Sequence, residues 1–405
     1  MLSLLKFLLI IALTVFLLVR KWDLGLVLLL NTALVAVLFA YPALLLLRSI
    51  GLALIASDTL SLAGAVYLVL VLAELMRRTH SMEGMASALQ ALVPDSRVVL
   101  ALIPLLIGLM PMLGGAMFSA PMVNEIGAAL QLRAERKTYI NYWFRHTMEY
   151  VFPLYSSVLM LSALFGFSVY DFVRTSWPMT LVAIGAGILI GLVGIPKPAA
   201  QPSQARPSGA WGALFRSTWP LLAVVLAVAV LKLNMLVTLL GVIVGVVLIN
   251  RIGPSQWLDV LKRSFPIHTF TAIFGVMIFK HVLEDAGAVA QVPPALAGLG
   301  LPPLLIAFLV PLLVGLLTGV APAALVVSVP LVAPLLTGLG LDPLTAGLWI
   351  FVGGFSGVLL SPMHLCLALT RDYFKANWAG LYRAILPSVA IAVAAAVVLV
   401  LLRQR

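Results

Sequence analysis

Long apolar runs dominate this sequence, and they restrict the chain to a fold that spans a membrane. Of its 405 residues, 63% are hydrophobic and 10% are charged, a balance that is not found in a water-soluble domain of this size. Within a bilayer every backbone amide and carbonyl must bond inside the protein, which leaves α-helices or a closed β-barrel. The runs are continuous rather than alternating, so they predict helices. We therefore expect an all-α polytopic membrane protein.

The same composition argues against several classes of function. The net charge of +11 comes from basic residues that lie between apolar runs, which is typical of membrane topology rather than of nucleic-acid binding. The sequence contains no Walker loop, and its one cysteine is Cys366. His146 and Glu149 form H-x-x-E rather than the H-E-x-x-H of a zinc hydrolase. We expect no enzyme activity, no cofactor, no transition-metal site and no nucleic-acid partner.

Two apolar segments, residues 97–130 and 301–337, are interrupted where a spanning helix would continue. Each contains Gly and Pro and then a Ser-x-Pro-apolar-Val stretch, which begins at Ser119 in the first and at Ser328 in the second. Arg97–Met110 would reach roughly 20 Å at 1.5 Å per residue, which is too short for a hydrocarbon core of about 30 Å. Each segment therefore predicts a re-entrant hairpin of two half-length helices.

The order of the elements repeats. We expect a first repeat over residues 1–194, a cytoplasmic Pro/Ser-rich linker over 195–217 and a second repeat over 218–405. Each repeat has five crossings and one hairpin, ten crossings in total, and its fifth helix is broken. Because five is odd, the repeats must be inverted. The predicted crossings are Leu2–Val19, Leu24–Ala40, Asp58–Met76, Asn141–Phe167, Trp177–Gly194, Trp219–Leu231, Met235–Ile249, Pro266–Leu283, Leu348–Leu369 and Leu381–Leu402.

The basic residues provide a check on this topology. With the ends of the crossings placed alternately on two sides, 18 of the 25 Lys and Arg residues fall on one side and 7 on the other. The positive-inside rule assigns the richer side to the cytoplasm. This places the linker in the cytoplasm and both termini outside, in a multi-pass protein of the inner (plasma) membrane.

The hairpin tips are the first candidate site. Backbone groups exposed at a tip must face protein or a water-filled cavity, and each tip offers one helix C-terminus for cations and one N-terminus for anions. The alternative is that Gly and Pro only allow close helix packing. For two symmetrically placed tips we favour substrate binding, with Na⁺ as a candidate ion. The residues concerned are Gly114, Gly115, Ser119, Thr318, Gly319 and Ser328.

The broken helices are the second candidate site. Pro153-Leu154-Tyr155 aligns with Pro362-Met363-His364, and each proline frees a backbone carbonyl. Tyr155 and His364 are candidate substrate ligands. Candidate ion-coupling residues are Ser156, Ser157, Ser361, Glu149 and Glu125. The alternatives are a simple kink, a structural Arg145–Glu149 ion pair, and a buried His364 that only forms hydrogen bonds.

The sequence resembles a known group of proteins. The inverted halves, the two hairpins and the two broken helices resemble the ion transporter superfamily, which includes divalent-anion:sodium symporters and citrate, arsenite and gluconate permeases. PMLGGAMFSAP and SPMHLCLALTRDYF are similar to a prokaryotic membrane family of unassigned function within it. The resemblance implies a homodimer in which hairpins and broken helices move as a transport domain. The Ser-Asn-Thr tip motifs of the dicarboxylate branch are missing, so that specificity does not carry over.

These observations predict a secondary active transporter of a small solute, an organic or inorganic anion, coupled to Na⁺ or H⁺. One alternative is a Na⁺/H⁺ antiporter, for which Glu149 or Glu125 would have to be the membrane carboxylate. An alternative of another class is an intramembrane enzyme or lipid-handling protein, for which only His146, Glu149 and His364 are available.

Overall fold

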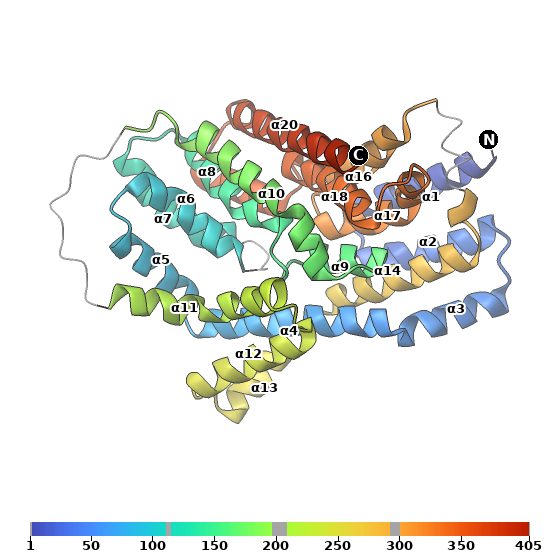
Figure 1. Ribbon diagram of the computed structural model, residues 1–405, viewed down its shortest axis with the longest axis horizontal. Helices are drawn as coiled ribbons and strands as arrows, with labels where there is room; N and C mark the ends of the chain where they lie inside the picture. Colours follow the sequence, from blue (N-terminus) through green and yellow to red (C-terminus); the bar gives the residue numbers. More distant parts are fainter. Residues whose placement is uncertain (1, 111–114, 197–208, 292–299, 405) are drawn as a thin grey trace.

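A computed structural model describes residues 2–110, 115–196, 209–291 and 300–404, and within these ranges the chain is helical and contains no strand (Figure 1). By length and composition, six helical segments of the described chain are long and apolar enough to cross a membrane. They are Ser57–Arg78, Val169–Leu192, Ala210–Val230, Ile267–Asp285, Pro343–Phe374 and Trp378–Arg403. The other four predicted crossings fall on shorter helices, so the total of ten stays a prediction.

The first half contains ten α-helices in the described chain. They are α1 Leu2–Val19, α2 Leu24–Leu38, α3 Ala43–Ile55, α4 Ser57–Arg78, α5 Ser81–Leu92, α6 Ser96–Gly108, α7 Ala116–Ala129, α8 Ala134–His146, α9 Ser156–Phe165 and α10 Val169–Gly187. A 3-10 turn, Thr147–Tyr150, follows α8, and a π-helical turn, Ile188–Leu192, extends α10. The amphipathic helix α5 is absent from the sequence prediction, because its polar residues give it a weaker hydropathy signal than the longer apolar runs on either side.

The second half continues in a similar order. Its described α-helices are α11 Ala210–Val225, α12 Met235–Ile249, α13 Pro254–Arg263, α14 Ile267–Asp285, α16 Pro303–Thr318, α17 Ala321–Thr337, α18 Pro343–Leu360, α19 Leu365–Phe374 and α20 Trp378–Arg403. A π-helical turn, Leu226–Val230, extends α11, and a 3-10 turn spans Val289–Gln291. Helix α11 begins inside the range assigned to the linker, and residues 197–208 of that range lie outside the described chain.

Helices of the first half pack on helices of the second half in a recurring pattern. Helix α2 packs on α14, and α12 packs on α4 (Figure 1). The first hairpin, α6 and α7, packs through α6 on α8 and through α7 on α19. The second hairpin, α16 and α17, packs in the same way through α16 on α18 and through α17 on α9. Each hairpin therefore joins the first part of its own broken helix to the second part of the other one.

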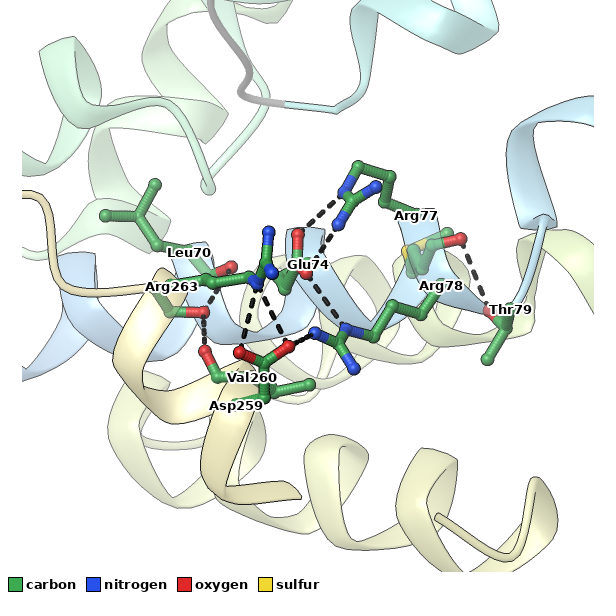
Figure 2. Close-up of polar contacts among 10 residues, drawn as sticks. Leu70, Glu74, Arg77, Arg78, Thr79, Asp259, Val260 and Arg263 are labelled. Atoms are coloured by element: carbon green, nitrogen blue, oxygen red, sulfur yellow. Dashed lines mark hydrogen bonds and ion pairs between the residues drawn. The ribbon is translucent and has the colours of Figure 1, made fainter. Parts of the chain in front are cut away.

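An ion cluster joins the end of α4 to the amphipathic helix α13. Figure 2 shows Asp259 between the guanidinium groups of Arg78 and Arg263, with Glu74 between Arg77 and Arg78. Glu74 Oε1 lies 2.6 Å from Arg77 and 2.9 Å from Arg78. Hydrogen bonds from Arg78 and then from Arg263 hold the pKa of Asp259 below its usual value. The cluster fixes α13 against α4, elements that are far apart in the chain.

We expect Asp259→Asn to lower the melting temperature of the purified protein slightly at neutral pH. The pKa of Asp259 is lowered on folding, so its contribution is present above the unfolded value of about 3.9 and is lost as the pH falls through the folded value. Partly exposed ion pairs are also screened by salt. Melting curves of both proteins at low and high salt check this, and a difference that does not shrink with salt contradicts it.

Candidate functional site

The breaks of the two interrupted helices meet inside the protein. The first break, residues 147–155, separates α8 from α9, and the second, residues 361–364, separates α18 from α19. His146 is 3% exposed and ends α8, and its Nε2 atom lies 3.0 Å from Nε2 of His364 in the second break. The hydroxyl of Tyr142 donates to the carbonyl of Leu359 at 3.1 Å. We call the region formed by these two breaks the junction.

The tip of the second hairpin contacts the junction directly. Gly319 ends α16 with a φ of +68°, the left-handed conformation that favours glycine at a helix C-terminus. Its carbonyl accepts a hydrogen bond from His364 Nδ1 at 2.7 Å. Thr318 donates within its own helix, to the carbonyl of Val314 at 2.8 Å. The geometry thus brings Gly319 and His364, which the sequence analysis assigned to two separate candidate sites, into contact.

The tip of the first hairpin is held by a buried cation. Arg145, which is 4% exposed, donates from Nη1 to the carbonyl of Ile107 at 3.1 Å. A Cβ atom added at Gly115 would lie 2.5 Å from Nη2 of Arg145, so a larger residue there would require the guanidinium to move. Asn141 donates to the carbonyl of Ala116, the first residue of α7, at 3.0 Å. Gly114, the other predicted tip glycine, lies outside the described residues.

Tyr155 and His364 occupy corresponding positions. The hydroxyl of Tyr155 donates to the carbonyl of Gly108, the last residue of α6, while His364 donates to that of Gly319 after α16. Each side chain thus leaves a helix break and bonds the end of the incoming hairpin arm of its own half. This matches the sequence alignment of the two proline motifs.

Two further ionisable side chains lie close to the histidine pair. Glu149 is in the 3-10 turn after α8, and its Oε1 atom lies 3.7 Å from His146 Nε2. Cys366 is buried in the first turn of α19, and its sulfur and one ring nitrogen of each histidine all lie within 4.8 Å of one another. Nitrogen and sulfur atoms at such separations are a potential ligand set for a metal ion.

Sequence reasoning missed this cluster. It predicted no transition-metal site, because His146 and Glu149 form H-x-x-E rather than H-E-x-x-H and because Cys366 is the one cysteine. The two histidines are 218 residues apart, and Cys366 was not considered with them. The available signal was the H-x-C motif of His364 and Cys366 directly after a proline break, combined with the alignment of that break with the one beside His146. Such an alignment implies that the two breaks meet when the halves pack reciprocally.

The predicted serines lie in the second break and in helices α9, α7 and α17. Ser361 is buried in the second break, where its Oγ atom accepts from the amide of Met363 at 3.1 Å. Ser156 and Ser157 begin α9. Ser119 donates within α7, to the carbonyl of Ala116 at 3.2 Å.

Two predicted residues lie farther along the outgoing arms. Ser328 is fully buried seven residues after the start of α17, and within the described chain its hydroxyl has no hydrogen-bond partner. Glu125 is exposed, nine residues after the start of α7 and thus about 13 Å along that helix. The structure does not bring Glu125 to the junction.

Comparison with known proteins supports the architecture. The chain is similar to a solved structure described as "Crystal structure of the Alcanivorax borkumensis YdaH transporter reveals an unusual topology". The TM-score is 0.69 at 15% identity, over 96% of this chain and 98% of the other. No curated protein matches the sequence.

The similarity to YdaH, together with the apolar helices, identifies a helical membrane protein with the fold of that structure. A family model described as "Protein of unknown function (DUF401)" matches residues 1–403, which is nearly the whole sequence. The chain therefore belongs to the family of proteins of unknown function DUF401.

Proposed function

We propose that this protein is a secondary active transporter of a small organic or inorganic anion, driven by a Na⁺ or H⁺ gradient. The observation that carries the proposal is the contact of the hairpin tips with a buried junction where two interrupted helices meet. Broken helices and exposed backbone at membrane depth are tolerated where they line a binding cavity. The transporter fold of YdaH supports the same class of function.

Helix N-termini and a buried cation favour an anionic solute. The outgoing hairpin arms α7 and α17 start at the tips, and the half-helices α9 and α19 start at the breaks. The free amides and the dipole at each start favour negative charge. Arg145 adds a guanidinium beside the first tip. An anion would therefore have four helix starts and one cation to bind.

We further propose an elevator-like movement. The hairpins and broken helices are packed reciprocally, α7 on α19 and α9 on α17, so they are suited to move as one body. The paired helices α2 with α14 and α4 with α12 would form the scaffold. Inverted repeats, a homodimer, a location in the inner membrane and membership of the ion transporter superfamily stay predictions within this proposal.

Binding of an anion by the purified full-length protein tests the proposal. A ligand that binds only the folded state stabilises it by about 2.7 kcal/mol at a free concentration of 100 times Kd. We expect one class of anion to raise the melting temperature in detergent. The same anion should then accumulate in proteoliposomes when an inward Na⁺ or H⁺ gradient is imposed, and not without a gradient.

The controls separate the candidate functions. Accumulation of the anion is measured under a Na⁺ gradient, in buffers with and without potassium, and under a pH gradient. The gradient that drives accumulation identifies the coupling ion. Exchange of Na⁺ for H⁺ without any anion would instead identify an antiporter. Failure of a broad set of carboxylates and oxyanions to bind or to be transported would contradict an anion transporter.

A further inference from the structure

We propose that His146, His364 and Cys366 form a binding site for a transition-metal cation of the zinc class, with Glu149 as the fourth ligand. The three side chains come from both halves of the chain and converge at the junction. Two imidazoles and one thiolate are preferred ligands of Zn²⁺. The inference goes beyond the proposed function, because binding of the metal requires neither an anion nor transport.

The backbone fixes which nitrogens face the site. His146 Nδ1 lies 2.6 Å from the carbonyl of Tyr142, and His364 Nδ1 lies 2.7 Å from the carbonyl of Gly319. A carbonyl only accepts, so both Nδ1 atoms carry the proton. Both Nε2 atoms therefore direct a lone pair toward each other in the neutral rings. Metal-bound histidines commonly donate their second ring N–H to a backbone carbonyl in this way.

The distances suit a metal after a small widening of the site. The two Nε2 atoms are 3.0 Å apart, whereas nitrogens bound to a tetrahedral zinc at about 2.0–2.1 Å are about 3.3–3.4 Å apart. Movements of a few tenths of an ångström produce that separation. Glu149 Oε1 is 3.7 Å from His146 Nε2, close to the spacing of neighbouring ligands.

Charge also favours a divalent metal over a shared proton. One proton between the Nε2 atoms would relieve their repulsion but would leave the Cys366 sulfur and the Glu149 carboxylate without a role. A divalent cation with a thiolate and a carboxylate is neutral as a unit, which lowers the cost of burying these charges. All four ligands are then used. The thiolate also favours zinc-class ions over Mg²⁺ or Ca²⁺, which prefer oxygen ligands.

Cobalt provides a direct test, because sulfur bound to Co²⁺ gives a ligand-to-metal charge-transfer band. Full-length protein, purified in detergent without a histidine tag and stripped with a chelator, is titrated with Co²⁺ and then with Zn²⁺. We expect one equivalent of Co²⁺ per chain, a sulfur-to-cobalt band, and displacement by Zn²⁺. Metal analysis of the protein before stripping measures what it carries from the cell.

Variants assign the ligands. Cys366→Ser should abolish the band, His364→Gln should weaken metal binding at least tenfold, and Glu149→Gln should weaken binding while the band is retained. The matched control is His268→Ala, since His268 is exposed and its loss should leave the titration unchanged. Melting curves without metal show that each variant is folded. Absence of stoichiometric binding to the parent protein, or a band that survives in Cys366→Ser, would overturn the proposal.

This experiment is separate from the test of anion transport. Metal binding with no anion transport would leave the site in place and remove the proposed function. Anion transport by a parent protein that binds no metal would support the proposed function and overturn the metal site.

Discussion

Gly319→Val is expected to abolish transport and to destabilise the protein strongly. A Cβ atom at this position would lie 2.6 Å from the amide nitrogen of His364 and 2.8 Å from its Cα atom, which are backbone atoms that cannot rotate away. Overpacking of this kind costs about 1–3 kcal/mol. The left-handed φ of +68° adds about 1–2 kcal/mol for a residue with a side chain. Proteoliposome transport and the melting temperature measure the two effects.

Gly340→Val is the matched control for this prediction. Gly340 also has a left-handed φ, +78°, but a Cβ atom there meets no atom within 4 Å. The control therefore carries the backbone strain without the collision with His364. We expect it to lose some stability and to retain transport. Equal losses in both variants would show that contact between the second tip and the junction is unimportant.

Arg145→Met is expected to have the second large effect. The guanidinium is buried and donates to the carbonyl of Ile107 in the first hairpin. A buried polar group that loses its partner costs about 1–3 kcal/mol, and methionine fills much of the space without supplying a donor. We expect a lower melting temperature and no detectable transport, because the first hairpin loses a hydrogen bond from α8 and the site loses its cation.

Arg133→Met controls for the loss of a positive charge. Arg133 directly precedes α8 and its side chain is exposed. Its free energy of unfolding should stay within about 0.5 kcal/mol of the parent value, and transport should be retained. Arg145→Lys preserves the charge but not the planar guanidinium, so it should retain more stability than Arg145→Met. Full transport by Arg145→Met would exclude Arg145 from the site.

The elements were largely predictable from the sequence. In a membrane the pattern of apolar residues indicates where helices lie, because backbone polar groups cannot be hydrated there. It did not fix their ends, since α10 begins at Val169 and α11 at Ala210, ahead of the predicted Trp177 and Trp219. The hairpin arms α6 with α7 and α16 with α17 cover the predicted segments 97–130 and 301–337 to within two residues at each end. Helix α5 was missed because it combines polar residues with a short apolar face, a pattern that gives a weak hydropathy signal.

The candidate site was predicted only in part. Proline and glycine directly mark positions where helices break, and the structure places Tyr155, Gly319 and His364 at helix ends, while their role as substrate ligands stays a prediction. Glu125 was grouped with them because a carboxylate near a hairpin in the sequence looks like a membrane carboxylate. In the structure Glu125 is exposed and lies nine residues along α7. A helix carries each residue 1.5 Å farther from its start, so Glu125 is too far from the tip to reach the junction.

By itself the sequence determined that this is a helical membrane protein, and it located the helix breaks and the candidate tips, because all of these follow from local hydropathy and backbone chemistry. Only the tertiary structure decided which breaks and tips meet. It bonds Arg145 to the first hairpin and places His146, His364 and Cys366 around one point. The histidine–cysteine cluster joins residues of opposite halves, and it depends on the reciprocal packing of α7 on α19 and α9 on α17, which no local pattern encodes.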